Sequence, residues 1–423
     1  MNLRRAKDAA KGLLQSSELG RFAYSRAQEL WFDSTYRARV RHYTEATAGD
    51  SDAYRQEAHL QRCRRKIAER GYRSPLRAAG EAHCFAFLPS HWSHQNQIAT
   101  ALALTGPCTR FDYASNGISL KELRTAAPGH IEKRRAVMEG LLAAIRAAHR
   151  QRPIDWFFSY AIGYDILPEA LTRIRDELGI PTVNVSFDDK NWWNEIERGD
   201  SSTGMKQLAP HFDLSWTSAR NVLPWYWAEG GQAIFLPEGV NVDWFKPLDI
   251  EQDIDVGFVG NNFGYRPELL GALRHAGVKV AHHGTGWPDS SELNDEQMRI
   301  FFNRCLINLG HGDMHYSRWL TNLKGRDFEI PAVGRGLYLT SYSSDLASCF
   351  DIAREIQCYR GIDELVDLVR RYLRNRDEIA EMARRARDRC IREHQWSHRF
   401  QALLRALGIL ETARQPRTNS PST

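Results

Sequence analysis

The 423-residue chain lacks any run of 18 apolar residues that would cross a membrane as a helix. Its first residues, Met1-Asn-Leu-Arg-Arg, also lack the apolar core of a secretory signal. We therefore expect a protein that is made and kept in the cytoplasm.

Cysteine pairs at metal-binding or redox spacing are missing as well. The seven cysteines are odd in number, scattered, and never arranged as C-x-x-C. This pattern argues against a disulfide framework and against a thiolate zinc site. We expect most of them to be small core residues.

Apolar and aromatic residues, in contrast, are plentiful. Hydrophobic residues make up 42% of the chain, with 12 Trp, 15 Tyr and 18 Phe, which is typical of a folded protein. The length is sufficient for two domains that each have their own core.

Charge is distributed unevenly. Residues 1–78 hold 17 Lys and Arg against 9 Asp and Glu, whereas the remainder holds 40 against 43. This segment is expected to be either a charged helical extension packed on the body or a docking element for an anionic membrane or an acceptor. It lacks the interleaved aromatics and the zinc or zipper signatures of nucleic-acid binding, so no nucleic acid is expected.

From residue 82 onward, short apolar strands alternate with helical segments, which indicates βαβ units and parallel sheets. A proline-bounded polar stretch, 238–253, interrupts the pattern and is interpreted as a linker. The expected organisation is a basic helical extension (1–78), a first Rossmann-like domain (82–237), the linker, a second Rossmann-like domain (254–395), a C-terminal helix (396–410) and a disordered tail (412–423).

Two glycine loops follow predicted strands in the second domain. The first runs Val259-Gly-Asn-Asn-Phe-Gly-Tyr-Arg and lacks both the Rossmann and the Walker spacing. A glycine loop that opens a helix can still bind an anion, which predicts contacts from Gly260, Asn261 and Arg266. The second loop supplies Gly284 and Thr285 as an opposite wall. An ordinary turn remains the alternative for both loops.

The segment from Arg326 to Thr340, Arg-Asp-Phe-Glu-Ile-Pro-Ala-Val-Gly-Arg-Gly-Leu-Tyr-Leu-Thr, is the most informative part of the chain. It places Glu329 just ahead of small residues and glycines and then enters an apolar strand. This layout predicts a helix whose first turn faces a ligand, with glycines that allow backbone to approach backbone.

This segment, together with the first glycine loop and the run from Glu355-Ile-Gln-Cys-Tyr-Arg-Gly to Trp396, resembles the group 1 glycosyltransferases of GT-B architecture, and most of all the CgeB-like spore-maturation branch. The resemblance covers most of residues 150–400. It implies an α/β fold with two Rossmann-like doubly wound domains facing a cleft, and transfer of a sugar from a nucleotide-diphosphate donor.

By this resemblance, Glu329 binds the ribose hydroxyls of the donor, and the glycine loops and basic residues face its diphosphate. Arg326 is the best diphosphate candidate, with Arg318 and Lys324 behind it. Helix dipoles and arginines would neutralise the diphosphate, so neither a metal ion nor a cofactor is expected.

One departure concerns the mechanism. Many group 1 retaining enzymes carry a Glu-x7-Glu pair, and Thr321 stands where the first glutamate would be. Retention or inversion therefore stays open. The candidate bases for an inverting transfer are His91, His94 and Asp188, which end strands of the first domain. Asp189 adjoins the last of these. Four tryptophans of that domain are candidates either for stacking on sugar or for core packing: Trp192, Trp193, Trp225 and Trp227.

The acceptor is expected to be a glycan, a lipid-linked glycan or another hydroxyl compound, and the protein can lie on the inner face of the membrane. Two alternatives share the scaffold. One is a sugar-nucleotide epimerase or phosphorylase, and the other is a non-catalytic binding or assembly protein.

Overall fold

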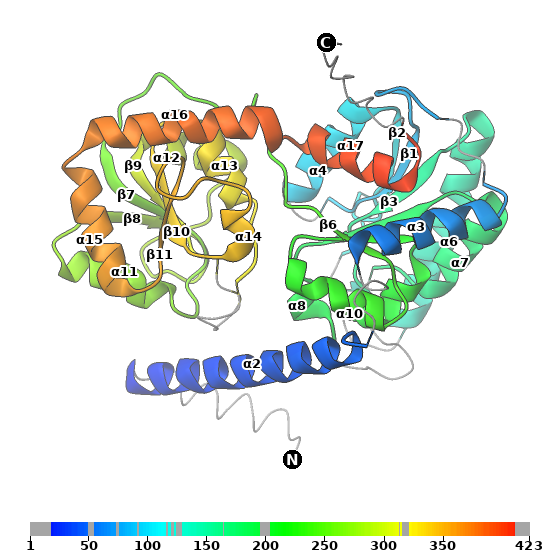
Figure 1. The fold of residues 1–423 in the computed structure, drawn as a ribbon, viewed down its shortest axis with the longest axis horizontal. Coiled ribbons are helices and arrows are strands. Elements are labelled where there is room, and N and C mark those ends of the chain that lie inside the picture. Colours follow the sequence, from blue (N-terminus) through cyan, green and yellow to red (C-terminus); the bar gives the residue numbers. More distant parts are fainter. Residues whose placement is uncertain are drawn as a thin grey trace, which may run out of the picture. The chain divides into compact units, whose positions relative to one another are not determined.

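The computed structural model describes residues 18–49, 55–72, 76–90, 93–115, 117–119, 122–123, 129–163, 165–194, 204–312, 314 and 321–410 (Figure 1). These residues fold into two compact units. The N-domain takes its described residues from Thr47–Leu236 and Trp396–Thr423, and the C-domain takes them from Pro237–Gln395 and Met1–Ala46. Within the described ranges, no helix is both long enough and apolar enough to cross a membrane.

The N-domain is built around a parallel sheet with the strand order β2-β1-β3-β4-β5-β6. The chain first moves to one edge, returns past β1 and then fills the other side, which makes the sheet doubly wound. Its strands are β1 (Cys84–Phe87), β2 (Cys108–Phe111), β3 (Trp156–Ser159), β4 (Thr182–Ser186), β5 (Leu214–Thr217) and β6 (Ala233–Phe235). Its helices include α3 (Gln56–Glu69), α4 (Ser93–Thr105), α6 (His130–Gln151), α7 (Pro168–Leu178), α8 (Asp189–Trp192), α10 (Leu223–Ala228) and α17 (Trp396–Leu407).

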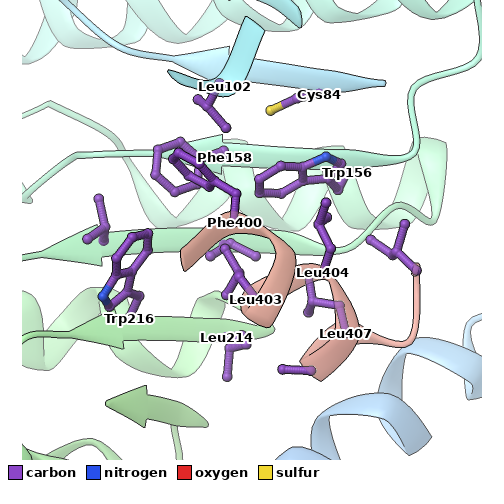
Figure 2. Packing of buried hydrophobic residues seen from close by; sticks show 14 of the residues in the cluster. Cys84, Leu102, Trp156, Phe158, Leu214, Trp216, Phe400, Leu403, Leu404 and Leu407 are labelled. Carbon is purple, nitrogen blue, oxygen red and sulfur yellow. The ribbon is translucent and has the colours of Figure 1, made fainter. Parts of the chain in front are cut away.

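One face of this sheet carries a core of aromatic and aliphatic side chains (Figure 2). Because side chains alternate along a strand, Trp156 and Phe158 share this face. Phe400 of α17 lies against both of them and against Trp216, with ring centroids 5.6 to 6.5 Å apart. The last helix of the chain therefore completes the core of the N-domain.

Helix α3, from the N-terminal part of the sequence, packs on the same core. It buries one stripe of side chains under the sheet: Leu60, Cys63 and Ile67. The sequence assigned this helix to the extension 1–78 and α17 to a separate segment 396–410. In the structure both helices pack on the N-domain sheet. The packing of α3 on the sheet is difficult to predict from the sequence, because α3 contains many arginines and only a narrow stripe of it is apolar.

The C-domain contains a second parallel sheet, in the order β11-β10-β9-β7-β8. Its direction of winding reverses between β7 and β9, so this pair marks the topological switch point. The strands are β7 (Ile254–Val259), β8 (Val280–His283), β9 (Cys305–Leu309), β10 (Leu337–Ser341) and β11 (Gln357–Tyr359). The helices are α2 (Glu18–Ala46), α11 (Arg266–His275), α12 (Asp295–Arg304), α13 (Arg326–Val333), α14 (Ser344–Ala347), α15 (Ile362–Leu373) and α16 (Arg376–Glu393).

Helices cover both faces of this sheet (Figure 1). Phe258 of β7 belongs to a core cluster with residues of α11 and α15. The neighbouring Gly257 faces the other way, where an added Cβ would lie 2.8 Å from the Phe301 ring of α12. Helix α13 packs on that second face and against α16.

Glycines shape the passage from α13 into β10. Gly334 ends the helix with φ of 69°, in the left-handed region. At Gly336 an added Cβ would lie 2.3 Å from the Cys305 carbonyl oxygen of β9. The backbone contact that the sequence predicts for this segment is therefore present.

The α/β class and the doubly wound order are confirmed. The predicted alternation of short strands with helices from residue 82 onward is also confirmed, whereas the strands β2 and β11 and the helix α6 were not predicted. The four residues of β2 are only half-buried, and the strand lies at the edge of its sheet, so its hydrophobic pattern is weak.

Candidate active site

The predicted donor residues gather at the carboxyl edge of the C-domain sheet. Three segments follow strands at this edge around the switch point: 260–265 after β7, 284–294 after β8, and after β9 the described residues 310–312, 314 and 321–325. Doubly wound sheets bind ligands in this place. The predicted residues lie in these loops or in the first turn of α11 or α13, as follows: Gly260, Asn261, Arg266, Gly284, Thr285, Arg326 and Glu329.

Glu329 is a buried carboxyl in the first turn of α13. Its side chain is 6% exposed, and no described residue donates a hydrogen bond to its carboxylate. Burial raises the pKa of Glu329 to about 7, while the positive charge of Arg326 lowers this pKa in part. A carboxyl in this situation gains by accepting hydrogen bonds from ligand hydroxyls.

Asp327, two residues earlier, shows what a structural carboxyl in the same helix looks like. It accepts hydrogen bonds from the Tyr338 hydroxyl at 2.5 Å and from the Lys324 backbone N–H at 2.7 Å. Burial also raises its pKa, to about 6. Asp327 is thus used to fix the start of α13, whereas Glu329 is not.

Arg326 is half-buried at the first position of α13. Its buried Nε has no hydrogen-bond partner within the described part of the chain. Its positive charge lowers the pKa of Glu329 in part. Arg318 lies outside the described residues.

The two glycine loops lie side by side and are hydrogen-bonded to each other. The Gly260 N–H donates to the His283 carbonyl, and the Asn262 N–H donates to the Thr285 carbonyl, each at 2.8 Å. Gly284 touches Gly260 so closely that an added Cβ would lie 2.3 Å from the Gly260 carbonyl oxygen. The loops therefore form one paired surface, and these amides are used within it instead of facing an anion from opposite walls.

The side chains of these loops are also engaged. The Thr285 hydroxyl donates to Glu292, and Asn261 Oδ1 accepts from the Thr285 N–H at 3.3 Å. Arg266 donates to the Asn261 carbonyl at 3.1 Å and stacks over the Phe263 ring at 4.2 Å. Arg266 is consequently held in position beside the loop.

His311 is a further candidate site residue, and it was not predicted from the sequence. It follows β9 at the switch point, and its Nδ1 lies 2.9 Å from the Tyr359 hydroxyl. That hydroxyl donates its single proton to the Gly310 carbonyl at 3.0 Å, so Nδ1 must be the donor of the first bond. The ring of Tyr265, from the first glycine loop, lies 5.9 Å away. The sequence pattern that could have indicated His311 is a polar side chain directly after a buried strand.

The three candidate bases of the N-domain are described unequally. His91 lies outside the described residues, and for His94 only its place in α4 is described. Asp188 is half-buried at the end of β4. Its neighbour Asp189 is fully buried, with a pKa raised to about 6 by burial, and accepts from the Tyr226 hydroxyl at 3.2 Å. Asp189 therefore joins α8 to α10, and Asp188 stays the candidate base.

Two of the four tryptophans offered for sugar stacking are core residues. Trp193 and Trp225 are buried and meet edge to face, with ring centroids 5.5 Å apart. Trp227 stacks on His59 of α3 at 4.4 Å. Of the two alternatives, sugar stacking and core packing, core packing applies to Trp193 and Trp225.

Residues 266–405 match the model of a family described as glycosyl transferase-like. No curated protein matches the sequence. Solved structures with a similar fold include sucrose-phosphate synthase from Thermosynechococcus elongatus, with a TM-score of 0.53 and 12% identity over 78% of this chain and 99% of that one. HepE from Anabaena, in complex with UDP and glucose, has a TM-score of 0.53 and 12% identity over 78% and 100%.

A glycosyltransferase from Rickettsia africae is similar to the same degree, with a TM-score of 0.53 and 10% identity over 79% of this chain and 100% of that one. Identities this low establish the fold and leave the substrates open. The chain therefore has the GT-B fold, and its residues 266–405 match the glycosyl transferase-like family model.

Proposed function

We propose that the chain is a metal-independent glycosyltransferase that moves a sugar from a nucleotide-diphosphate donor to an acceptor hydroxyl. The observation that carries this proposal is Glu329, a carboxyl 94% buried at the switch point that accepts no hydrogen bond from the described residues. A carboxylate can accept from both hydroxyls of a ribose. HepE, which shares the fold, was solved with UDP and glucose.

In this proposal the C-domain binds the donor. Arg326 and Arg266 contact the diphosphate, because guanidinium groups match phosphate oxygens in geometry and charge. The paired loops carrying Gly260, Asn261, Gly284 and Thr285 hold Arg266 and the start of α11 in place beside it.

The N-domain supplies the base. In an inverting transfer, Asp188, or else His94 or His91, takes the proton of the acceptor hydroxyl as its oxygen attacks the anomeric carbon. The bond from that carbon to the phosphate oxygen breaks, and the nucleoside diphosphate leaves with the electron pair.

A donor panel tests the function. We expect one class of nucleotide-diphosphate sugar to raise the melting temperature of the full-length protein by several degrees, as a ligand does that binds only the folded state. Release of free nucleoside diphosphate should then require an acceptor. No shift with any donor would favour a non-catalytic protein. Sugar isomerisation, or nucleotide release with phosphate alone, would favour the epimerase or phosphorylase.

We also propose that α2 docks on an anionic membrane. It exposes Leu30 and Trp31, which are 68% and 61% accessible, together with Arg37 and Arg41. Tryptophan is enriched at the lipid interface, and each basic residue contributes about 1 kcal/mol near an anionic surface. We expect Trp31→Ser with Arg41→Glu to reduce flotation with phosphatidylserine vesicles at least tenfold. Equal flotation of variant and native protein would end this proposal.

A further inference from the structure

Two buried carboxyl groups converge on Gly325, the residue that precedes α13. An added Cβ at Gly325 would lie 3.3 Å from Glu238 Oε2 and 3.4 Å from Glu329 Oε1. Glu238 is 3% exposed and Glu329 is 6% exposed. Both oxygens therefore border the same small volume at the start of the helix.

The conformation of Gly325 does not explain why a glycine stands there. Its φ of −49° and ψ of −38° are right-handed helical values that any residue adopts. What a side chain at this position would meet is the two carboxyl groups. The glycine keeps open the space between them.

Glu238 is fixed in the C-domain by its chain neighbours. Val240, two residues on, donates its N–H to the His394 carbonyl at 2.9 Å. The ring of His394 packs on Phe328 of α13 at 5.2 Å, and its Nε2 lies 2.9 Å from the Cys349 carbonyl oxygen. The segment with Glu238 is thus tied to the same helix that carries Glu329.

The two carboxyl groups bring acceptor oxygens to one small volume beside Gly325. No described residue donates to the carboxylate of Glu329. Such a pair suits a ligand with two adjacent hydroxyl groups, because each carboxylate oxygen can accept one O–H.

We propose that Glu238 and Glu329 together bind two adjacent hydroxyl groups of the ligand, those of the donor ribose. This inference rests on the proposed function and adds a second residue, contributed by the segment that precedes β7, to the ribose site. Glu238 would then supply a second carboxylate in a chain that has Thr321 in place of the first glutamate of the Glu-x7-Glu pair.

The test compares ribonucleoside diphosphates with their 2′-deoxy and 3′-deoxy forms. ADP, GDP, CDP and UDP and these analogues are titrated into the full-length protein by calorimetry. The native protein should prefer the ribose form of its best nucleotide at least tenfold over either analogue. Glu238→Gln should reduce this preference at least threefold and keep the melting temperature within about two degrees of native.

A second variant covers the case in which Glu238→Gln does not fold. Gly325→Ala is compatible with the helical backbone and places a methyl group between the two carboxyls. It should weaken binding of the ribose form at least tenfold and binding of the deoxy forms less. Glu355→Gln is the matched control, since Glu355 is also buried in the C-domain but is bonded to Arg389. It should leave the preference unchanged.

The outcomes separate the two proposals. If no ribonucleoside diphosphate binds the native protein, the proposed function and this inference both fail. If Glu329→Ala abolishes the ribose preference while Glu238→Gln or Gly325→Ala keeps it in full, the function stands and the role of Glu238 is wrong.

Discussion

The Glu329→Ala variant is expected to bind nucleoside diphosphates at least 100-fold more weakly than the native protein. In our proposal this carboxylate accepts two hydroxyl hydrogen bonds in a buried place. Hydrogen bonds to a charged group contribute roughly 1.5–3 kcal/mol each, and about 2.7 kcal/mol corresponds to 100-fold in affinity. Isothermal calorimetry with the best nucleotide of the donor panel measures the loss.

Replacing Glu329 is expected to increase the stability of the protein, although it weakens nucleotide binding. Burial raises the pKa of Glu329 to about 7. A folded-state pKa above the unfolded value contributes stability that is fully present below the unfolded pKa and is lost as pH rises through the folded pKa. Ionised Glu329 therefore costs stability at pH 8, by about 3 kcal/mol at roughly 1.4 kcal/mol per pKa unit. Glu329→Gln removes this cost.

We expect the stabilisation by Glu329→Gln to grow by about 2 kcal/mol between pH 5 and pH 8. Chemical denaturation of both proteins at the two pH values measures it. A buried acid remote from Glu329, such as Asp189, titrates in both proteins, so its effect cancels in the difference. A variant that loses stability at pH 8 would show that Glu329 is already satisfied by the protein.

Asp327→Ala is the matched control on the same helix. The Tyr338 hydroxyl donates to this carboxyl, so its removal leaves a buried donor without its partner and should destabilise the C-domain. Nucleotide affinity of the folded protein should stay near native. Equal losses of affinity in both variants would mean that Glu329 acts through the fold of α13 and does not contact the ligand.

Local patterns predicted much of the fold and little of the site. Helix α7 (Pro168–Leu178) has ends that can be read from the sequence, because Pro168 marks its start and Gly179 its end. The packing of α3 and α17 on the N-domain sheet was not predicted, because their packing partners are strands remote in the sequence. Contacts of this kind leave no periodic signal in the helix itself.

Within the candidate site, Glu329 could be selected from the sequence because the small residues, glycines and apolar strand that mark it are its neighbours in the chain. Glu238 could not, since only the folded chain brings it to Gly325. The glycine loops were predicted as opposing walls of an anion site. Their mutual pairing through Gly260 and Gly284 depends on the neighbouring positions of β7 and β8 in the sheet, which the sequence does not state.

Gly284→Ala is expected to destabilise the C-domain by at least about 3 kcal/mol. Gly284 has a φ of 142°, which L-residues rarely adopt, and its added Cβ would lie 2.3 Å from the backbone oxygen of Gly260. Backbone cannot yield as a flexible side chain can, so the paired loops must separate. Urea denaturation measures this loss as a lower midpoint, with an unchanged slope of the free energy of unfolding against urea concentration.

Gly271→Ala provides the matched comparison one element away. Gly271 is exposed in the interior of α11, and an added Cβ would meet nothing within 4 Å. Alanine should therefore stabilise the helix by about 0.5–1 kcal/mol, because it loses less backbone entropy on folding. A loss of stability in Gly284→Ala together with a gain in Gly271→Ala would establish that close contact between the loops determines the geometry beside Arg266. The number of glycines would then not be the cause. If Gly284→Ala were as stable as the native protein, the pairing of the loops would be wrong, and with it the held position of Arg266.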